Sequence, residues 1–366
     1  MAMESNRSVN KWMRKFFPKA SEQDRGELID LWRRMESVRF PDPDETALSE
    51  EELLERTPRA EIRETDMGRI IGKGSYAVVH RVEWNDKSYA MKSFSSKSEA
   101  LRELAIQSKL SGHPHILPPL AYAEIPRASD AQSDKFSILM ELCDGSIDPR
   151  GRSIDTLAEF AAADALEIML QLARALLFIH SQRIMHRDVK PGNVLYRSKD
   201  PAQEGFVSGG TMIKLADFGT SRFIREGSYV HTAKRGTKCY WAPEVVQDGP
   251  TCPYTDRADV YSFAMTCYAI GTGRTPLERY ARLSSRDFYR KVCGWGWILP
   301  GKRPKVPRWM DPALARVMKQ CWHSTPEERP PMGVVCWALE FLAARASGAA
   351  RAELSPALYP IVNDRP

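Results

Sequence analysis

The apolar residues of this chain follow two periodicities, and their order along the chain limits the folds that it can adopt. Alternation with a period of two, which is typical of strands, runs through 68–81, 88–94 and 136–142. Helical spacing of three and four residues appears at 100–110 and then dominates, at 163–180, 259–270 and 333–344. Strands early and helices late predict an α+β fold, with a small sheet lobe preceding a larger helical lobe.

Composition limits the class of protein further. The chain has 366 residues, 43% of them hydrophobic, which is enough for a core divided between lobes. Seven scattered cysteines without CxxC pairs indicate reduced thiols in a cytoplasmic or nuclear protein, not disulfides or a zinc site. The charged first 17 residues resemble no signal peptide, and the longest apolar stretch, 260–270, is about half of what a bilayer needs. The mild, mixed net charge of +6 does not favour nucleic-acid binding, and we expect no integral membrane association.

Three regions differ in composition: a charged N-terminal extension, 1–61, a long middle region, 62–346, and a short tail, 347–366. In the extension, helical spacing joins an apolar stripe that ends before a Phe-Pro pair: Leu28, Leu31, Trp32, Met35 and Val38. We expect this helix to dock on the neighbouring lobe, with partner binding as the alternative.

Two further segments of the extension carry local signals. The basic and aromatic run 11–17 is interpreted as a frayed terminus, with weak contact to an anionic membrane as the alternative. Ser49 with Glu52 forms a capping-box pattern that predicts a short helix through Leu53 and Leu54.

The run HRDVKPGN at 186–193, followed by DFG at 217–219, carries the most specific chemistry. It supplies a base in Asp188, a cation in Lys190, and oxygen ligands for metal ions in Asn193 and Asp217. Charged runs also occur in solvated loops after helices, but the context of the other motifs opposes that interpretation. The pattern indicates a phosphoryl-transfer site.

Two motifs in the strand-rich part complete this site. Glycines at 72 and 74 interrupt two strand patterns, where backbone N–H groups can approach phosphate oxygens. Lys92 ends an apolar strand and therefore needs an anion, either a phosphate or a glutamate of the following helix. Glu99 and Glu103 are candidates, and Glu103 is preferred because it shares a helical face with Ile106 and Leu110.

Together with Ala242-Pro243-Glu244, these motifs follow the order of eukaryotic protein kinases, which the chain resembles from Ile70 to about Arg345. The resemblance implies a bilobal fold, with an antiparallel N-lobe sheet and one main helix in 62–142 and a mostly α-helical C-lobe in 143–346. Ala77 departs from the family by replacing the third glycine of the loop.

The resemblance also implies a role for each site residue, with ATP and Mg²⁺ as cofactors. Asp188 would accept the substrate's hydroxyl proton beside Lys190, Asn193 and Asp217 would hold Mg²⁺, and Lys92 paired with Glu103 would position the phosphates. Met140 fits the gatekeeper before the hinge. The nucleotide-binding residues would be Ile71, Gly72, Lys73, Gly74, Ser75, Tyr76, Ala77, Val79, Ala90, Lys92, Met140, Glu141, Cys143 and Leu195.

Several residues narrow the resemblance. The resemblance places Thr237 on the substrate side, and Thr237 and Lys190 are residue types found at these positions in serine/threonine kinases. The pair Cys321-Trp322 is similar to the form found in the tyrosine-kinase-like group. Gly192 replaces an acidic residue common in kinases that prefer basic substrates. Asp259 would lie under the catalytic loop, and Arg329 would pair with Glu244.

Regulation is expected in the segment after DFG. Arg187 precedes the catalytic aspartate, where regulated kinases bind a loop phosphate, and Ser228 or Thr232 would carry that phosphate. An upstream kinase or autophosphorylation would supply it. The surplus residues 198–210 and the polar loop 126–134 are interpreted as surface loops.

The sequence therefore predicts an active serine/threonine protein kinase with protein substrates. The alternatives are a pseudokinase or scaffold that binds nucleotide or partners without efficient catalysis, and a kinase of small molecules. The first is opposed by the complete set of catalytic residues, and the second by the peptide-docking segment around Thr237. Oligomeric state and physiological substrate have no signal in the sequence.

Overall fold

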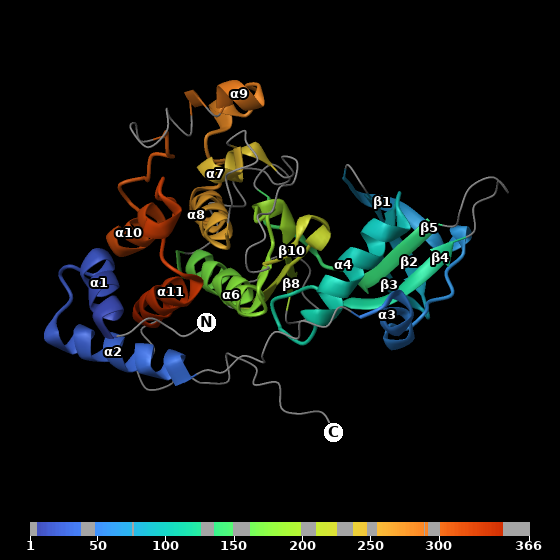
Figure 1. Ribbon diagram of the computed structural model, residues 1–366, viewed down its shortest axis with the longest axis horizontal. Helices are drawn as coiled ribbons and strands as arrows, with labels where there is room; N and C mark the ends of the chain where they lie inside the picture. Colours follow the sequence, from blue (N-terminus) through green and yellow to red (C-terminus); the bar gives the residue numbers. More distant parts are fainter. Residues whose placement is uncertain are drawn as a thin grey trace.

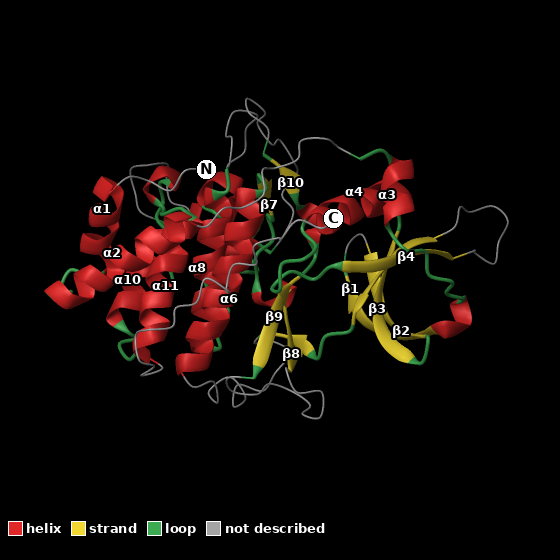
Figure 2. Ribbon diagram, turned by 90° about the horizontal axis from the view of Figure 1, so that it is seen from below, coloured by secondary structure: helices red, strands yellow, loops and turns green. Residues whose placement is uncertain are grey.

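The computed structural model describes residues 6–37, 48–74, 77–125, 135–148, 162–198, 210–224, 237–246, 255–288, 290–291 and 301–346. It has a lobe built on a β-sheet and a larger helical lobe, as Figures 1 and 2 show. This is the α+β bilobal arrangement that the sequence predicted.

The N-lobe contains one antiparallel sheet with strand order β1-β2-β3-β5-β4. Alternation along β5 sends Ile138 to one face and Leu139 to the other, and each joins a separate apolar cluster. The cluster of Ile138 includes Ala100 and Leu104 of helix α4, which covers that face. The bounds are β1 Met67–Lys73, β2 Ala77–Trp84, β3 Lys87–Phe94, α4 Lys97–Lys109, β4 Pro119–Ile125 and β5 Lys135–Glu141.

The C-lobe is built around α8, which is buried along nearly all of its length. Helices α6 and α10 pack against it, α11 packs on α6 and α10, and small sheets carry the loops that face the N-lobe (Figure 2). The helices are α6 Ala162–Ser181, α7 Pro243–Val246, α8 Arg257–Thr272, α9 Ser285–Phe288, α10 Pro312–Cys321 and α11 Met332–Ala346. The strands are β6 Gly145–Ser146, β7 Ile184–Met185, β8 Val194–Ser198, β9 Thr211–Leu215 and β10 Arg222–Phe223.

A buried ion pair joins two distant parts of the C-lobe. Arg329 is fully buried, and its guanidinium contacts both carboxylate oxygens of Glu244, at 2.6 and 2.8 Å. This two-point geometry confirms the predicted pair. It ties the start of α7 to the chain just before α11, because a bidentate arginine fixes orientation as well as distance.

The interpretation of residues 11–17 as a frayed terminus is wrong. These residues lie in and just after α1 Asn6–Phe16, and the side chains of Trp12, Met13, Phe16 and Phe17 are buried. The Arg316 guanidinium of α10 donates to the carbonyl of Phe16 at 2.6 Å. The apolar side of α1 is thus covered by protein, which removes the surface that the membrane alternative required.

The predicted apolar stripe lies on α2 Glu22–Ser37, and α2 packs on α11 at the far end of the C-lobe (Figure 1). The rings of Trp32 and Trp337 pack edge to face, with their centroids 5.8 Å apart. The indole N–H of Trp337 donates to the carbonyl of Leu28 at 2.7 Å. The stripe is therefore a docking face within the molecule. It packs on the C-lobe, whereas the lobe that follows it in the sequence is the N-lobe. Val38, the last residue of the predicted stripe, lies outside the described residues.

The third helix of the extension, α3 Glu50–Arg56, begins with the predicted capping box. The Ser49 hydroxyl accepts the Glu52 N–H at 3.2 Å, and the Glu52 carboxylate accepts the Ser49 N–H at 2.8 Å. Unlike α1 and α2, this helix lies on the N-lobe, near α4 (Figure 2).

The two predicted surface loops each lie between a pair of antiparallel strands. The surplus at 198–210 lies between β8 and β9, which pair antiparallel, so it connects two strands of a hairpin; 199–209 lie outside the described residues. The loop 126–134, between the paired strands β4 and β5, also lies outside them. The cysteines of the described ranges are free thiols.

Among the helices that can be described, none is both long and apolar enough to cross a bilayer.

Phe16→Ala should lower the free energy of unfolding of the C-lobe by about 3–5 kcal/mol, because the ring is fully buried between α1 and the C-lobe helices. The exposed Arg14 of the same helix provides a matched control, and Arg14→Ala should change stability by less than about 0.5 kcal/mol. Urea unfolding followed by tryptophan fluorescence measures both. Equal stabilities of the two variants would contradict the docking of α1.

Candidate active site

A cleft between the lobes contains nearly all of the predicted site residues. Its cavity measures about 1390 Å³ and is lined by β1, β2 and β3, by the segment after β5, and by loops of the C-lobe. Ser75 and Tyr76, at the tip of the glycine loop, lie outside the described residues. Every other predicted nucleotide-binding residue lines the cavity: Ile71, Gly72, Lys73, Gly74, Ala77, Val79, Ala90, Lys92, Met140, Glu141, Cys143 and Leu195.

The apolar end of the cleft forms where β3 and β5 run side by side. Ala90 pairs in register with Met140, and Leu195 approaches from the C-lobe side of the same cavity. The Gln107 amide of α4 contacts the Met140 sulfur at 3.6 Å and so fixes the side chain from behind. Burial, and then the nearby Glu141 carboxylate, raise the pKa of the Cys143 thiol to about 12. Cys143 is therefore a neutral wall of the cavity.

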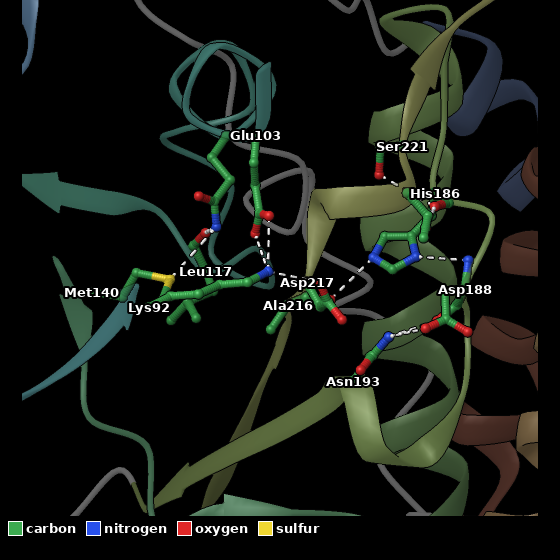
Figure 3. A network of polar contacts seen from close by, with 12 residues as sticks. Lys92, Glu103, Leu117, Met140, His186, Asp188, Asn193, Ala216, Asp217 and Ser221 are labelled. Carbon is green, nitrogen blue, oxygen red and sulfur yellow. Dashed lines mark hydrogen bonds and ion pairs between the residues drawn. The ribbon is translucent and has the colours of Figure 1, made fainter. Parts of the chain in front are cut away.

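The charged end of the cleft is built on Lys92 (Figure 3). Its ammonium lies 2.6 and 2.8 Å from the two carboxylate oxygens of Glu103 and 2.8 Å from a carboxylate oxygen of Asp217. The structure thus pairs Lys92 with Glu103, the glutamate preferred over Glu99. A strand, a helix of the N-lobe and a loop of the C-lobe meet at one cation.

The electrostatics of this cluster favour the charged forms of Lys92 and Asp217. Burial lowers the pKa of Lys92, but the carboxylates of Glu103 and Asp217 outweigh burial and raise it above its ordinary value. Burial likewise opposes ionisation of Asp217, yet the Lys92 ammonium holds the pKa of Asp217 at about 2. For Glu103 burial is the larger effect and raises its pKa, with Lys92 opposing. An anionic phosphate near Lys92 would replace part of this carboxylate charge.

Two backbone features position Asp217. Its φ of 64° lies in the left-handed region, which is costly for a residue with a side chain and is common at functional sites. A Cβ atom at Gly219 would lie 3.0 Å from a Glu103 carboxylate oxygen, so glycine lets this loop pass close to α4 without displacing that carboxylate.

The predicted base, Asp188, lies on the opposite wall of the cleft and is largely buried. One of its carboxylate oxygens accepts from the Lys190 ammonium at 2.6 Å and from the Asn193 amide at 3.0 Å, and the other from the Thr237 N–H at 3.3 Å. The structure therefore brings together four of the residues to which the sequence assigned catalysis, metal binding and the substrate side. Lys190 and Thr237 flank the carboxylate from separate segments.

Asp259 of α8 holds the backbone before this base. Its carboxylate accepts the N–H groups of His186 and Arg187, each at 2.8 Å, and contacts His180 Nε2 at 3.0 Å. The predicted position of Asp259 under the catalytic loop is confirmed. The contact with His180 was missed by the sequence analysis, because nothing in a helical histidine indicates a partner so far along the chain.

The loop after DFG is also attached to this frame. The carbonyl of His186 accepts from the hydroxyl groups of Thr220 and Ser221, at 3.0 and 3.2 Å. The sequence carries no signal for these bonds, and Ser221, a hydroxyl of the expected regulatory segment, is fully buried. The expected phosphorylation sites Ser228 and Thr232 lie outside the described residues, whereas Arg187 lies within them.

The donor set fits Mg²⁺. Asn193 donates its amide nitrogen to Asp188, so its side-chain oxygen is the atom left to act as a ligand, and Asp217 supplies a carboxylate to the same cavity. Mg²⁺ takes oxygen ligands and commonly binds through one or two side chains together with substrate phosphates. Within the described ranges, no cluster of three or more acidic, histidine or cysteine side chains could hold a metal ion by itself.

Comparison with known proteins supports the same assignment. A family model described as protein kinase domain matches residues 65–338, about three quarters of the chain. The chain therefore belongs to the eukaryotic protein kinases. It is 30% identical to a light-sensor protein kinase of Ceratodon purpureus, with 74% of the chain and 21% of that relative covered.

Two other relatives match over a similar part of the chain. A probable serine/threonine-protein kinase of Dictyostelium discoideum is 29% identical, with 75% of the chain and 16% of the relative covered. Human mitogen-activated protein kinase kinase kinase 7 is 26% identical, with 74% and 40% covered. The chain thus spans less than half the length of each of these relatives.

His186 should make the protein less stable in mild acid. Its ring is fully buried against Phe218, and its Nε2 and Nδ1 atoms contact the Ala216 carbonyl and the Asp188 N–H, which suits a neutral ring. Burial lowers its pKa, although Asp259 and other carboxylates oppose the shift. The unfolded chain therefore binds the extra proton first, and stability decreases as the pH falls below about 6.5.

Urea unfolding at pH 7.5 and pH 5.5 tests this expectation. One proton limits the contribution of His186 to at most about 1.4 kcal/mol of the loss per pH unit below its ordinary pKa. His186→Gln keeps a hydrogen-bonding side chain but does not titrate, so it should show a flatter pH dependence whatever its stability at pH 7.5. Parallel curves for wild type and variant would contradict a buried neutral His186.

Proposed function

We propose that this chain is an active serine/threonine protein kinase that transfers the γ-phosphate of ATP to hydroxyl groups of protein substrates. The observation that carries the proposal is the joint assembly of Lys92, Glu103 and Asp217 on one side of the cleft and Asp188 and Asn193 on the other. Phosphoryl transfer needs accurate positioning and neutralised charge more than covalent chemistry. Residues 62–346 would form the catalytic domain, with extensions at 1–61 and 347–366.

Each residue has a role that follows from its surroundings. Lys92, held by Glu103, would contact the α- and β-phosphates, while Gly72 and Gly74 would let backbone N–H groups approach them. Asp217 and Asn193 would hold Mg²⁺, which neutralises charge on the phosphate oxygens when bound.

The transfer step would take place beside Asp188. The substrate hydroxyl oxygen forms a bond to the γ-phosphorus, the bond from that phosphorus to the bridging oxygen of ADP breaks, and Asp188 accepts the hydroxyl proton. The Lys190 ammonium, 2.6 Å from Asp188, lies where it can contact the transferred phosphate. Serine and threonine preference is supported by Lys190 and Thr237 beside this carboxylate and by the name of the Dictyostelium relative.

Nucleotide binding without catalysis, as in a pseudokinase or scaffold, is the competing function. Ala77 is the one departure that favours it, yet the Ala77 carbonyl accepts the Gly74 N–H at 2.9 Å and closes the hairpin next to the cavity. The arrangement of the charged residues therefore favours catalysis.

Asp188→Ala should lower the phosphorylation rate of a generic protein substrate by about 10²-fold or more, because the base and the centre of the Lys190–Asn193 network are removed. Labelled ATP, Mg²⁺ and phosphoamino-acid analysis measure the rate and the residue modified. ATP binding of the variant, followed by fluorescence, serves as the control for folding. Equal labelling by wild type and variant would overturn the enzyme assignment, and phosphotyrosine alone would overturn the serine/threonine assignment.

Regulation by phosphorylation after DFG is the second part of the proposal. Arg187 precedes the base, and a phosphate on Ser228 or Thr232 would add charge-assisted hydrogen bonds that order the segment. Ser228→Ala/Thr232→Ala should lower activity about tenfold, the effect of one such bond. Tyr229→Phe is the matched control within the same segment. Full activity of the double variant, or of phosphatase-treated wild type, would contradict this regulation.

A further inference from the structure

The third helix of the N-terminal extension lies against the N-lobe where α4 meets the sheet. Leu53 of α3 is 3% exposed and belongs to one apolar cluster with Ala100 and Leu104 of α4 and Phe136 of β5. Leu54, on the next position of α3, is partly buried against the same cluster. The extension therefore contributes core side chains to the surface on which α4 rests.

A polar contact joins the same two helices. The ammonium of Lys97, the first residue of α4, lies 3.0 Å from the Glu50 carboxylate of α3 and 3.4 Å from Glu124 of β4. It also lies over the Phe136 ring, 5.9 Å from its centre. All three side chains remain accessible to solvent, and Lys97 and Glu50 are about half exposed, so the ion pairs contribute little energy by themselves. They fix the start of α4 relative to α3, while the apolar contacts of Leu53 provide most of the attraction.

The chain after α3 is fixed to the sheet independently of α4. The Ala60 N–H donates to the Tyr122 carbonyl at 2.7 Å, and the Tyr122 N–H donates to the Pro58 carbonyl at 2.9 Å, so this segment runs beside β4. Ala60 and Ile62 are buried in the cluster on the other face of the sheet. The segment that follows α3 is thus held on the sheet by contacts that do not involve α4.

Helix α4 in turn carries Glu103. Ala100 and Leu104 take part in the apolar cluster, while Glu103, next to Leu104, reaches Lys92 at 2.6 and 2.8 Å (Figure 3). A rotation or shift of α4 by about 1 Å would separate Glu103 from Lys92, because hydrogen bonds of this kind weaken steeply beyond about 3.2 Å. What holds α4 on the sheet also holds the ion pair of the cleft.

We propose that residues 48–62 are a built-in positioning element for the catalytic ion pair, with Leu53 as its positioning residue. Leu53 touches no substrate; it supports α4 in the orientation in which Glu103 meets Lys92. The inference rests on the proposed kinase activity for its catalytic consequence and on the contacts above for its structural part. It gives the N-terminal extension a function in catalysis that the sequence motifs do not indicate.

The test compares Leu53→Ala with Glu55→Ala in the full chain. Glu55 is an exposed residue of the same helix, so its removal leaves the docked face intact. Leu53→Ala should lower kcat about tenfold while the KM for ATP changes less, since Leu53 itself does not line the cavity. Glu55→Ala should retain wild-type kcat. Hydrogen exchange should become faster in α4 of Leu53→Ala and remain unchanged in α11.

A double-mutant cycle separates positioning from general destabilisation. If Leu53 acts through Glu103, Leu53→Ala should have no further effect on kcat in a Glu103→Gln background. The same fold loss in both backgrounds, or unchanged exchange in α4, would overturn the proposal. Leu53→Val replaces Leu53→Ala if exchange in α11 also rises, because it keeps most of the apolar contact. An inactive wild type would overturn the proposed function instead, and α4 exchange would then decide by itself whether α3 supports α4.

Discussion

The contact on which the rest of this structure depends is the buried cation of Lys92 between the carboxylates of Glu103 and Asp217. Taking charges out of water is costly, and the cost is met only when each charge has close partners. Here the partners come from three places: the strand of Lys92, the helix of Glu103 and the C-lobe loop of Asp217. The cluster therefore forms only when the lobes and α4 are in register. The close approach of Gly219 to Glu103 and the left-handed backbone of Asp217 both help to place Asp217 beside Lys92.

The C-lobe supplies a rigid counterpart through a second set of buried charges. Asp259 holds the backbone of His186 and Arg187 from below, and Arg329 ties Glu244 to the chain before α11. Burial opposes ionisation of Asp259, but the hydrogen bonds that its carboxylate accepts outweigh burial and lower its pKa. Asp188 follows directly on the first of these anchors, so its position relative to the cleft is set by α8. The catalytic loop is thus fixed to a helix core, whereas α4 is fixed to a smaller sheet lobe with fewer buried contacts.

The N-terminal extension touches both of these parts. Its first two helices cover α10 and α11 with Trp12, Phe16 and Trp32, and its third helix adds Leu53 to the cluster under α4. The two docking sites differ in kind. The first two helices add to the core of the C-lobe. The third helix packs against α4, the helix that carries Glu103. This difference is why the extension matters for the site as well as for stability.

The sequence by itself determined the class of fold, the family and the chemical groups of the site. These are local properties: periodicity marks strands and helices, and HRDVKPGN and DFG are short runs whose spacing is fixed within a loop. The capping box at Ser49 was also predictable, because both of its hydrogen bonds lie within one turn.

Only the tertiary structure decided which surfaces meet. The spacing of Leu28 and Trp32 predicted an apolar face, but it did not predict that the distant Trp337 would cover that face. The partners of the aromatic run at 11–17 are also distant in sequence, which is why the prediction of a frayed end was wrong. The support of α4 by Leu53 and the contact of Asp259 with His180 were likewise beyond the sequence. A local pattern fixes which side of an element must be buried, because that depends on the residues of the element alone. The partner that buries it depends on the packing of segments far apart along the chain, which no local periodicity encodes.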